Sequence, residues 1–220
     1  MIALTAMRRT MDTYDSARTA IAMVAALLAA VLVATCRARP TPLDVAVTFV
    51  NSWRMAGEAL SPGDQAIVKR TTLETLRRAY DRFGVRFDEA SSAARVIRVE
   101  DTPYSRPALT FGAAGVTYPA TRVSSVRFDV LVNGELAAAS CVSLARCTKA
   151  RGELLEGLGR GIGATGAHEL GHQAGFRFAL DSTCDDCYDG KASASYAHFF
   201  GRKHWSDRAL ALMREALPRH

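Results

Sequence analysis

The 220-residue sequence predicts a single α+β domain behind an N-terminal export segment. Apolar residues alternate with polar ones in several short segments, as in half-buried strands. Longer segments with helical spacing lie between and after them. We therefore expect a mixed, twisted sheet with a long N-terminal helix, a helix that carries the main motif, and a C-terminal helix. With 49% hydrophobic and 23% charged residues, the composition is that of an ordinary globular protein.

The strands are predicted from this alternation and from turn residues. Segment 44–50 alternates in Val45, Val47 and Phe49. Segment 94–100 is predicted as a second strand, and 108–118 as a weaker strand that glycine interrupts. In 126–140, valine and phenylalanine alternate ahead of Asn133-Gly134, which is favoured in two-residue turns. We therefore predict a hairpin over 126–140.

The helices are predicted from apolar faces and end signals. Residues 61–84 place leucine and aromatic side chains on one face, and Gly84 suits a C-terminal cap. A glycine-rich helical segment covers about 151–175. The last helix lies within 204–217, with Ser206 as its N-cap. We expect the segment between the last two helices to be irregular.

The N-terminus predicts export. Residues 19–35 carry no charge and follow Arg8, Arg9 and Arg18, the layout of a secretory signal. Cys36 comes next, which resembles the cleaved and lipidated cysteine of bacterial lipoprotein signals. An ordinary signal peptide and an uncleaved membrane anchor are the alternatives for 1–36. We expect a lipid-anchored, periplasmic, cell-surface or secreted protein, attached to the membrane through this segment where it is retained.

Residues 37–43 are then a short tether, and 44–220 form the domain. Four cysteines remain in it, and export would place them where disulfides persist. Three pairings are possible. Sequence proximity favours Cys141 with Cys147 and Cys184 with Cys187.

The stretch "GATGAHELGHQAGF", residues 163–176, carries the chemistry. His168 and His172 lie one turn apart on a helix, so both imidazoles can bind one metal ion. Glu169 lies about 100° around the helix and can take a proton from an attacking water that zinc activates. The spacing predicts zinc-dependent peptide hydrolysis. The alternative is a solvent-facing polar helix, which the small and apolar residues around the motif disfavour.

This stretch resembles the active-site helix of metzincin-type zinc peptidases, whose pattern is HExxHxxGxxH or HExxHxxGxxD. The resemblance implies zinc at His168 and His172, Glu169 as general base, and Gly175 as the turn toward a third ligand. Metzincin domains also share the predicted order of strand, helix, strands, motif helix, loop and final helix. The resemblance covers most of 44–217, although only the motif is specific.

The sequence departs from the metzincin pattern after Gly175. The expected third ligand would be residue 178, which is phenylalanine and cannot bind zinc. Catalytic zinc normally has three protein ligands, and we predict Asp181 as the third. The other candidates are Asp185, Asp186 and His198.

The methionine that metzincins place in a tight turn below the metal is also missing from this chain. "CYDG", 187–190, would occupy that turn. We therefore place Tyr188 beneath the site, where its phenol could stabilise the oxyanion.

For two further motifs, we favour a structural role over a functional one. Cys184 and Cys187 form a CxxC that could bind zinc or run redox chemistry, but its loop context favours a structural disulfide. The glycines at 157, 159, 161 and 163 lack the strand and the Lys-Ser/Thr of a phosphate loop. Close packing of the helix against its neighbours explains them better.

We conclude that the sequence encodes an exported Zn²⁺ metallopeptidase acting on peptides or proteins. A non-catalytic envelope binding or structural protein on a degenerate peptidase scaffold is the alternative. The net charge of +6 is not concentrated in a basic run, which argues against nucleic-acid binding. We expect a monomer.

Overall fold

The computed structural model describes residues 41–102, 113–141, 144, 146–175, 184–190 and 195–218, apart from the side chain of residue 119. All of them belong to one unit of the chain, Pro40–His220. The predicted signal or anchor at 1–36 and most of the tether lie outside the described residues. Among the residues described, no helix has both the length and the apolar composition that a membrane span requires.

A five-stranded mixed sheet forms the centre of the domain, in the order β4-β1-β5-β7-β6. Four strands are parallel, and the edge strand β6 runs antiparallel to β7. The strands are β1 (Leu43–Val50), β4 (Val85–Glu89), β5 (Arg95–Glu100), β6 (Gly115–Tyr118) and β7 (Val123–Arg127), and a small separate ribbon pairs β2 (Arg54–Met55) with β3 (Glu58–Ala59). The strands predicted at 44–50 and 94–100 are confirmed as β1 and β5. The weaker strand predicted at 108–118 is confirmed only at its end, as β6, because 103–112 lie outside the described residues.

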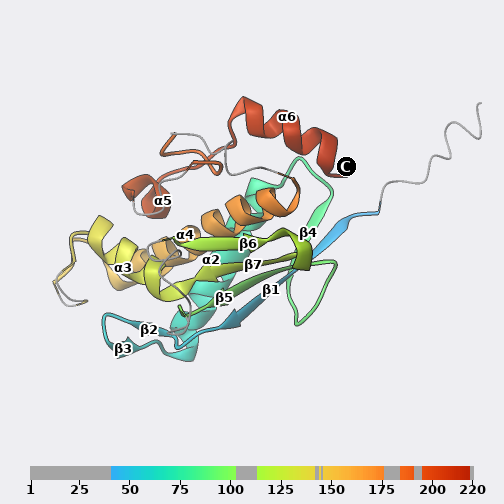
Figure 1. Ribbon diagram of the computed structural model, residues 1–220. Helices are drawn as coiled ribbons and strands as arrows, with labels where there is room; N and C mark the ends of the chain where they lie inside the picture. The colour runs from blue at the N-terminus through green and yellow to red at the C-terminus, as the bar shows by residue number, and fades with distance from the viewer. Residues whose placement is uncertain are drawn as a thin grey trace, which may run out of the picture. The chain divides into compact units, whose positions relative to one another are not determined.

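Two long helices, α2 (Pro62–Ala79) and α4 (Arg151–Gln173), lie side by side along the sheet (Figure 1). Ser61 begins α2 with a capping box, because its hydroxyl accepts from Asp64 N and the Asp64 carboxylate accepts from Ser61 N. The helix ends at Ala79, so the predicted cap at Gly84 is wrong. Tyr80 and Phe83 are nevertheless buried, because the chain after α2 turns back under the same core.

The glycines of α4 let it approach its neighbours closely, as predicted. A Cβ atom on Gly163 would lie 2.6 Å from the Thr75 side chain, and one on Gly159 would lie 2.8 Å from the Val68 carbonyl of α2. Thr72 Oγ1 donates to the Gly159 carbonyl at 3.2 Å across this contact. The motif helix is therefore held against α2 on one side and the sheet on the other.

The hairpin predicted over 126–140 is wrong, because β7 ends at Arg127 and Phe128–Ala138 form helix α3. The same residues also carry a helical apolar pattern. Phe128, Leu131 and Val132 are buried with that spacing. Packing of α3 on α4 selects the helix over the turn that Asn133-Gly134 favours locally.

Two shorter helices complete the domain. The predicted C-terminal helix is confirmed as α6 (Asp207–Ala216), and the Ser206 hydroxyl caps it by accepting from Ala209 N. The segment expected to be irregular contains the short helix α5 (Tyr196–Phe200). Its buried Phe199 fills the space that Gly161 of α4 leaves open, which explains why this part of the segment is ordered as a helix.

Candidate active site

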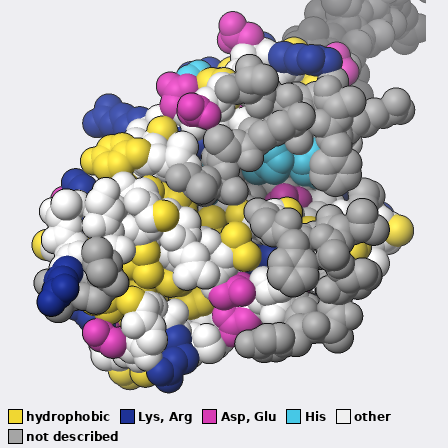
Figure 2. Space-filling view, turned by 60° about the vertical axis from the view of Figure 1, so that its left-hand side comes forward, with side chains coloured by type: hydrophobic (Ala, Val, Ile, Leu, Met, Phe, Trp, Pro, Cys, Tyr) yellow, Lys and Arg dark blue, Asp and Glu magenta, His cyan; other side chains and the backbone are white. Residues whose placement is uncertain are grey.

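The last two turns of α4 bring His168 and His172 together. Their Nε2 atoms lie 3.0 Å apart and their rings are nearly perpendicular, at 83°. His168 is half-buried, and His172 is 4% exposed. Figure 2 shows histidine side chains at the bottom of a hollow, with acidic side-chain atoms beside them. Gly175 follows with a φ of +109°, which confirms the predicted left-handed turn after the helix.

A backbone carbonyl fixes the tautomer of His168. Its Nδ1 lies 2.9 Å from the Tyr188 carbonyl oxygen, and because a carbonyl only accepts, Nδ1 carries the proton. In the neutral ring, the lone pair is then on Nε2, the atom that faces His172. Metal-bound histidines commonly use their second nitrogen in this way.

The paired imidazoles suit zinc. Two nitrogens that share a tetrahedral zinc at about 2.0–2.1 Å lie about 3.3–3.4 Å apart. The observed separation of 3.0 Å needs only a small adjustment of the two rings. Imidazole is a common ligand type for catalytic zinc, so the donor atoms present fit this metal.

Glu169 points from α4 toward the edge of the sheet. Its Oε2 accepts a hydrogen bond from Thr117 Oγ1 of β6 at 2.5 Å, and the residue is 4% exposed. Gly115 makes room for it, since a Cβ at that position would lie 2.5 Å from Glu169 Oε1. The carboxylate is thus held in one place between α4 and β6.

A buried chain of hydrogen bonds leads to this carboxylate. Gln173 Nε2 donates to Ser124 Oγ at 2.8 Å, and Ser124 Oγ lies 2.8 Å from Thr117 Oγ1. All three residues are buried. Sequence reasoning missed Thr117, Ser124 and Gln173, because single polar residues in strands or at a helix end carry no spacing signal. Only the pairing of β6 with β7 brings them beside Glu169.

Tyr188 lies beside the site, and its backbone rather than its phenol contacts a motif residue. Its carbonyl accepts from His168, whereas its ring packs on Trp205 with centroids 5.3 Å apart. Burial raises the pKa of the Tyr188 phenol, which stays neutral at physiological pH.

The predicted third ligand, Asp181, lies outside the described residues. Among those that the structure describes, no other His, Cys, Asp or Glu completes a group of three with His168 and His172. Asp185 is exposed. His198 is buried, and its Nε2 lies 3.0 Å from the Gly161 carbonyl, to which it donates. Burial, with the nearby charge of Lys203, lowers the pKa of His198 to about 3, so this ring is neutral.

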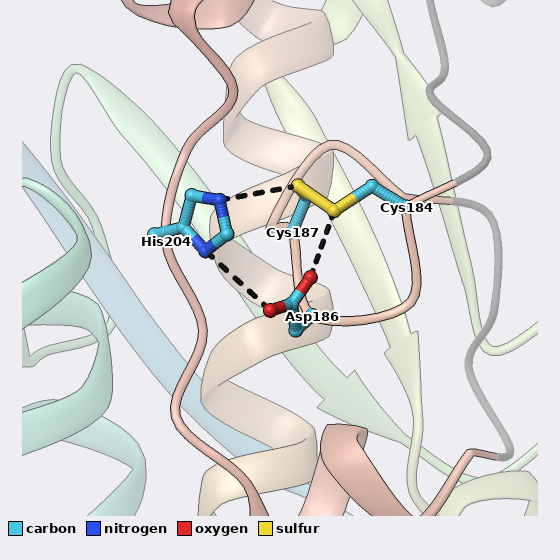
Figure 3. A group of neighbouring side chains, drawn as sticks. All are labelled: Cys184, Asp186, Cys187 and His204. Atoms are coloured by element: carbon cyan, nitrogen blue, oxygen red, sulfur yellow. Dashed lines mark hydrogen bonds and ion pairs between the residues drawn. A yellow bond between two sulfur atoms is a disulfide. The ribbon is translucent and has the colours of Figure 1, made fainter.

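Asp186 belongs to a different cluster, with Cys184, Cys187 and His204 (Figure 3). Its carboxylate lies 2.9 Å from Cys184 Sγ and 3.9 Å from His204 Nδ1. The two cysteines form a disulfide, so their sulfurs are not the thiolates that zinc binds. The cluster therefore stiffens the loop that supplies the Tyr188 carbonyl.

Both disulfides match the pairing that sequence proximity favoured, Cys141 with Cys147 and Cys184 with Cys187. Disulfides are typical of extracellular and periplasmic proteins and rare in the cytosol. The structure is thus consistent with an oxidising compartment.

Comparison with known proteins identifies no family. No protein-family model and no curated protein sequence matches the chain. Among solved structures, the chain is similar to a zinc-dependent peptidase from Methanocorpusculum labreanum (strain Z), with a TM-score of 0.49 and 13% identity, over 77% of this chain and 99% of that chain. The function must therefore be argued from the side chains of the site.

Proposed function

We propose that this protein is an exported zinc-dependent metallopeptidase. The observation that carries the proposal is the meeting of His168 Nε2 and His172 Nε2 at 3.0 Å. The Tyr188 carbonyl supports it, because it directs the lone pair of His168 toward that meeting point. A buried carboxylate, Glu169, lies on the same helix next to His168.

In this proposal His168, His172 and Asp181 hold the zinc ion. Zinc, when bound, lowers the pKa of a water molecule and polarises the peptide carbonyl. Glu169 takes the proton of the attacking water on a carboxylate oxygen and then passes it to the leaving amine. Thr117 holds the carboxylate by its Oε2 atom during both transfers. Tyr188 is the proposed donor to the oxyanion, which requires its ring to leave Trp205 when substrate binds.

Metal analysis of the full-length protein tests the site. We expect about one zinc per chain, lost in His172→Ala and in Asp181→Ala and retained in Asp185→Ala and Asp186→Ala. Retention of zinc in Asp181→Ala together with loss in another aspartate variant would move the third ligand to that residue. Wild type that neither carries zinc nor takes it up on titration would overturn the proposal.

Cleavage of a peptide library tests the chemistry. Glu169→Gln should keep zinc and lose cleavage, and Tyr188→Phe should keep zinc and lower the rate. If wild type binds zinc but cleaves no peptide or protein, the alternative of a non-catalytic envelope protein on a peptidase scaffold holds.

We also propose that export uses residues 1–36, with Cys36 as a lipid attachment site. The two disulfides support export. Mass spectrometry of the N-terminal peptide of the protein isolated from its own cells would show a diacylglyceryl group on Cys36. An unmodified, membrane-free protein would indicate an ordinary signal peptide.

A further inference from the structure

A cavity with cationic walls lies against helix α4, at Ala164, one helical turn before His168. Its volume is about 360 Å³, and its walls include Arg78, Arg160, Tyr188, His198, Arg202 and Lys203. We call it the cationic cavity. Helix α2, helix α4, the loop at Tyr188 and the segment after α5 each contribute to it. Its size is at the lower end of the range for small-ligand pockets.

The cationic cavity and the histidine pair share one side of α4. Ala164 lines the cavity and precedes His168 by one turn, about 6 Å along the helix axis. Tyr188 lines the cavity as well, and its carbonyl accepts from His168 Nδ1. An extended peptide advances about 3.3 Å per residue, so the cavity lies within reach of a residue one or two positions from a bond held at the histidines.

The positive charge of the cavity is only partly compensated. Arg160 donates from Nε to the Phe199 carbonyl at 2.7 Å and lies 3.5 Å from Glu156. Arg78 and Arg202 are exposed, and neither forms an ion pair with any residue that the structure describes.

Lys203 is half-buried in this wall. Its ammonium donates to the Asp185 carbonyl at 2.9 Å, and burial lowers its pKa against the opposing charges of Asp186, Asp185 and Asp189. Those carboxylates reduce the net charge but do not line the cavity. Because His198 is neutral, it adds no charge of its own.

We propose that the cationic cavity binds a carboxylate of the peptide substrate, either an Asp or Glu side chain or the free C-terminal carboxylate. This inference rests on the proposed peptidase function. Arg78 and Arg202 supply forked donors at the rim, which match the two oxygens of a carboxylate. Arg160 and Lys203 are already hydrogen-bonded to carbonyl groups and keep the deeper wall positive. The cavity would thereby determine which bond of an acidic peptide substrate is cleaved.

Peptide binding tests the inference without relying on turnover. The full-length protein carrying Glu169→Gln is titrated into fluorescent peptides in which each position in turn is Glu or its neutral isostere Gln. Each peptide is prepared with a free and with an amidated C-terminus, which separates the two sources of carboxylate. We expect about tenfold tighter binding for the carboxylate at one position or at the free end, the effect of one charge-assisted hydrogen bond.

The paired variant Arg78→Gln/Arg202→Gln should abolish this preference. Its matched control is Arg70→Gln/Arg86→Gln, which removes the same charge from two exposed arginines that pair with Glu74 and Asp44 away from the cavity. The control should keep the preference, and the melting temperature of both variants shows that they are folded.

The outcomes separate the two proposals. Equal affinity for Glu and Gln peptides at every position, with free and amidated ends alike, would overturn the cationic cavity as a carboxylate site. A preference that survives Arg78→Gln/Arg202→Gln would overturn it too. Absence of zinc or of cleavage in wild type would overturn the peptidase function alone, because the affinity comparison uses no turnover.

Discussion

At the scale of single residues, each motif side chain is positioned by a hydrogen bond to a neighbouring residue. That bond leaves another atom of the side chain available for metal or proton chemistry. His168 offers Nε2 because its Nδ1 proton is committed to the Tyr188 carbonyl. Glu169 is likewise held by a residue that carries no reactive group itself. Thr117 donates to its Oε2 at 2.5 Å from the neighbouring strand.

Thr117→Val should lower kcat about tenfold while zinc content stays at the wild-type level. Valine keeps the shape of threonine but removes the hydroxyl, and the loss of one hydrogen bond to a charged group costs about 1.5 kcal/mol or more. Peptide cleavage and metal analysis of the same preparation measure both effects. Thr117→Ser restores a hydroxyl and should restore most of the rate.

Thr121→Val is the control, because this exposed threonine donates to the Tyr118 carbonyl and has no hydrogen bond to Glu169 among the residues that the structure describes. Wild-type kcat in Thr117→Val would mean that this threonine does not position Glu169.

The site residues that could be predicted from the sequence are those whose spacing along the chain matches a known metal-binding pattern. His168, Glu169 and His172 are recognisable because a helix brings positions four apart onto one face. Thr117, Ser124 and Gln173 are not, because their contact with Glu169 depends on a strand pairing between distant segments.

At the scale of elements, α4 is central, since it contacts α2, α3, α5 and the sheet. Three of its glycines lie at two of these contacts, with Gly159 and Gly163 against α2 and Gly161 against Phe199 of α5. Glycine lowers intrinsic helix stability by about 1 kcal/mol per residue. Packing therefore compensates for the weak helix propensity of this segment.

Gly163→Ala should destabilise the fold by about 1–3 kcal/mol, the typical cost of overpacking a filled core. Its Cβ would lie 2.6 Å from Thr75 Cβ and 2.8 Å from the Thr72 carbonyl, and the carbonyl belongs to a helix that cannot easily move aside. Urea unfolding followed by circular dichroism measures the change. Gly152→Ala at the start of the same helix meets nothing within 4 Å and should be neutral or slightly stabilising. Equal stability of the two variants would contradict this account of the helix contact.

Helices and strands could be predicted where a single apolar period dominated the segment. The cap of α6 at Ser206 could be predicted because a polar residue directly precedes the apolar face of the helix. The segment after β7 could not, because its apolar residues fit both a two-residue and a helical period. The packing of this segment on α4 favours the helix over the hairpin, and no local sequence pattern reveals that packing.

At the scale of the whole molecule, stability should depend on a carboxyl group buried where three helices meet. Glu135 of α3 is fully buried, and a Cβ on Gly157 of α4 would clash with its Oε1 and with Phe200 of α5. Burial raises the pKa of Glu135 to about 9 from an ordinary 4.5, against weaker opposing effects of the Leu158 backbone and Arg160. The folded protein therefore keeps this proton at neutral pH, whereas the unfolded chain releases it.

The free energy of unfolding should consequently fall as pH rises from about 4.5 to about 9, and this fall should level off above the folded pKa. Glu135→Gln mimics the protonated carboxyl and should remove the slope, which makes the variant more stable than wild type at pH 8 by an amount on the order of a few kcal/mol. Urea unfolding of both proteins between pH 5 and about 9 measures the two slopes. Exposed Glu74→Gln on α2 is the control and should leave the wild-type slope unchanged. Parallel pH curves for wild type and Glu135→Gln would mean that the pKa of Glu135 is the same in the folded and the unfolded protein, which would contradict this account.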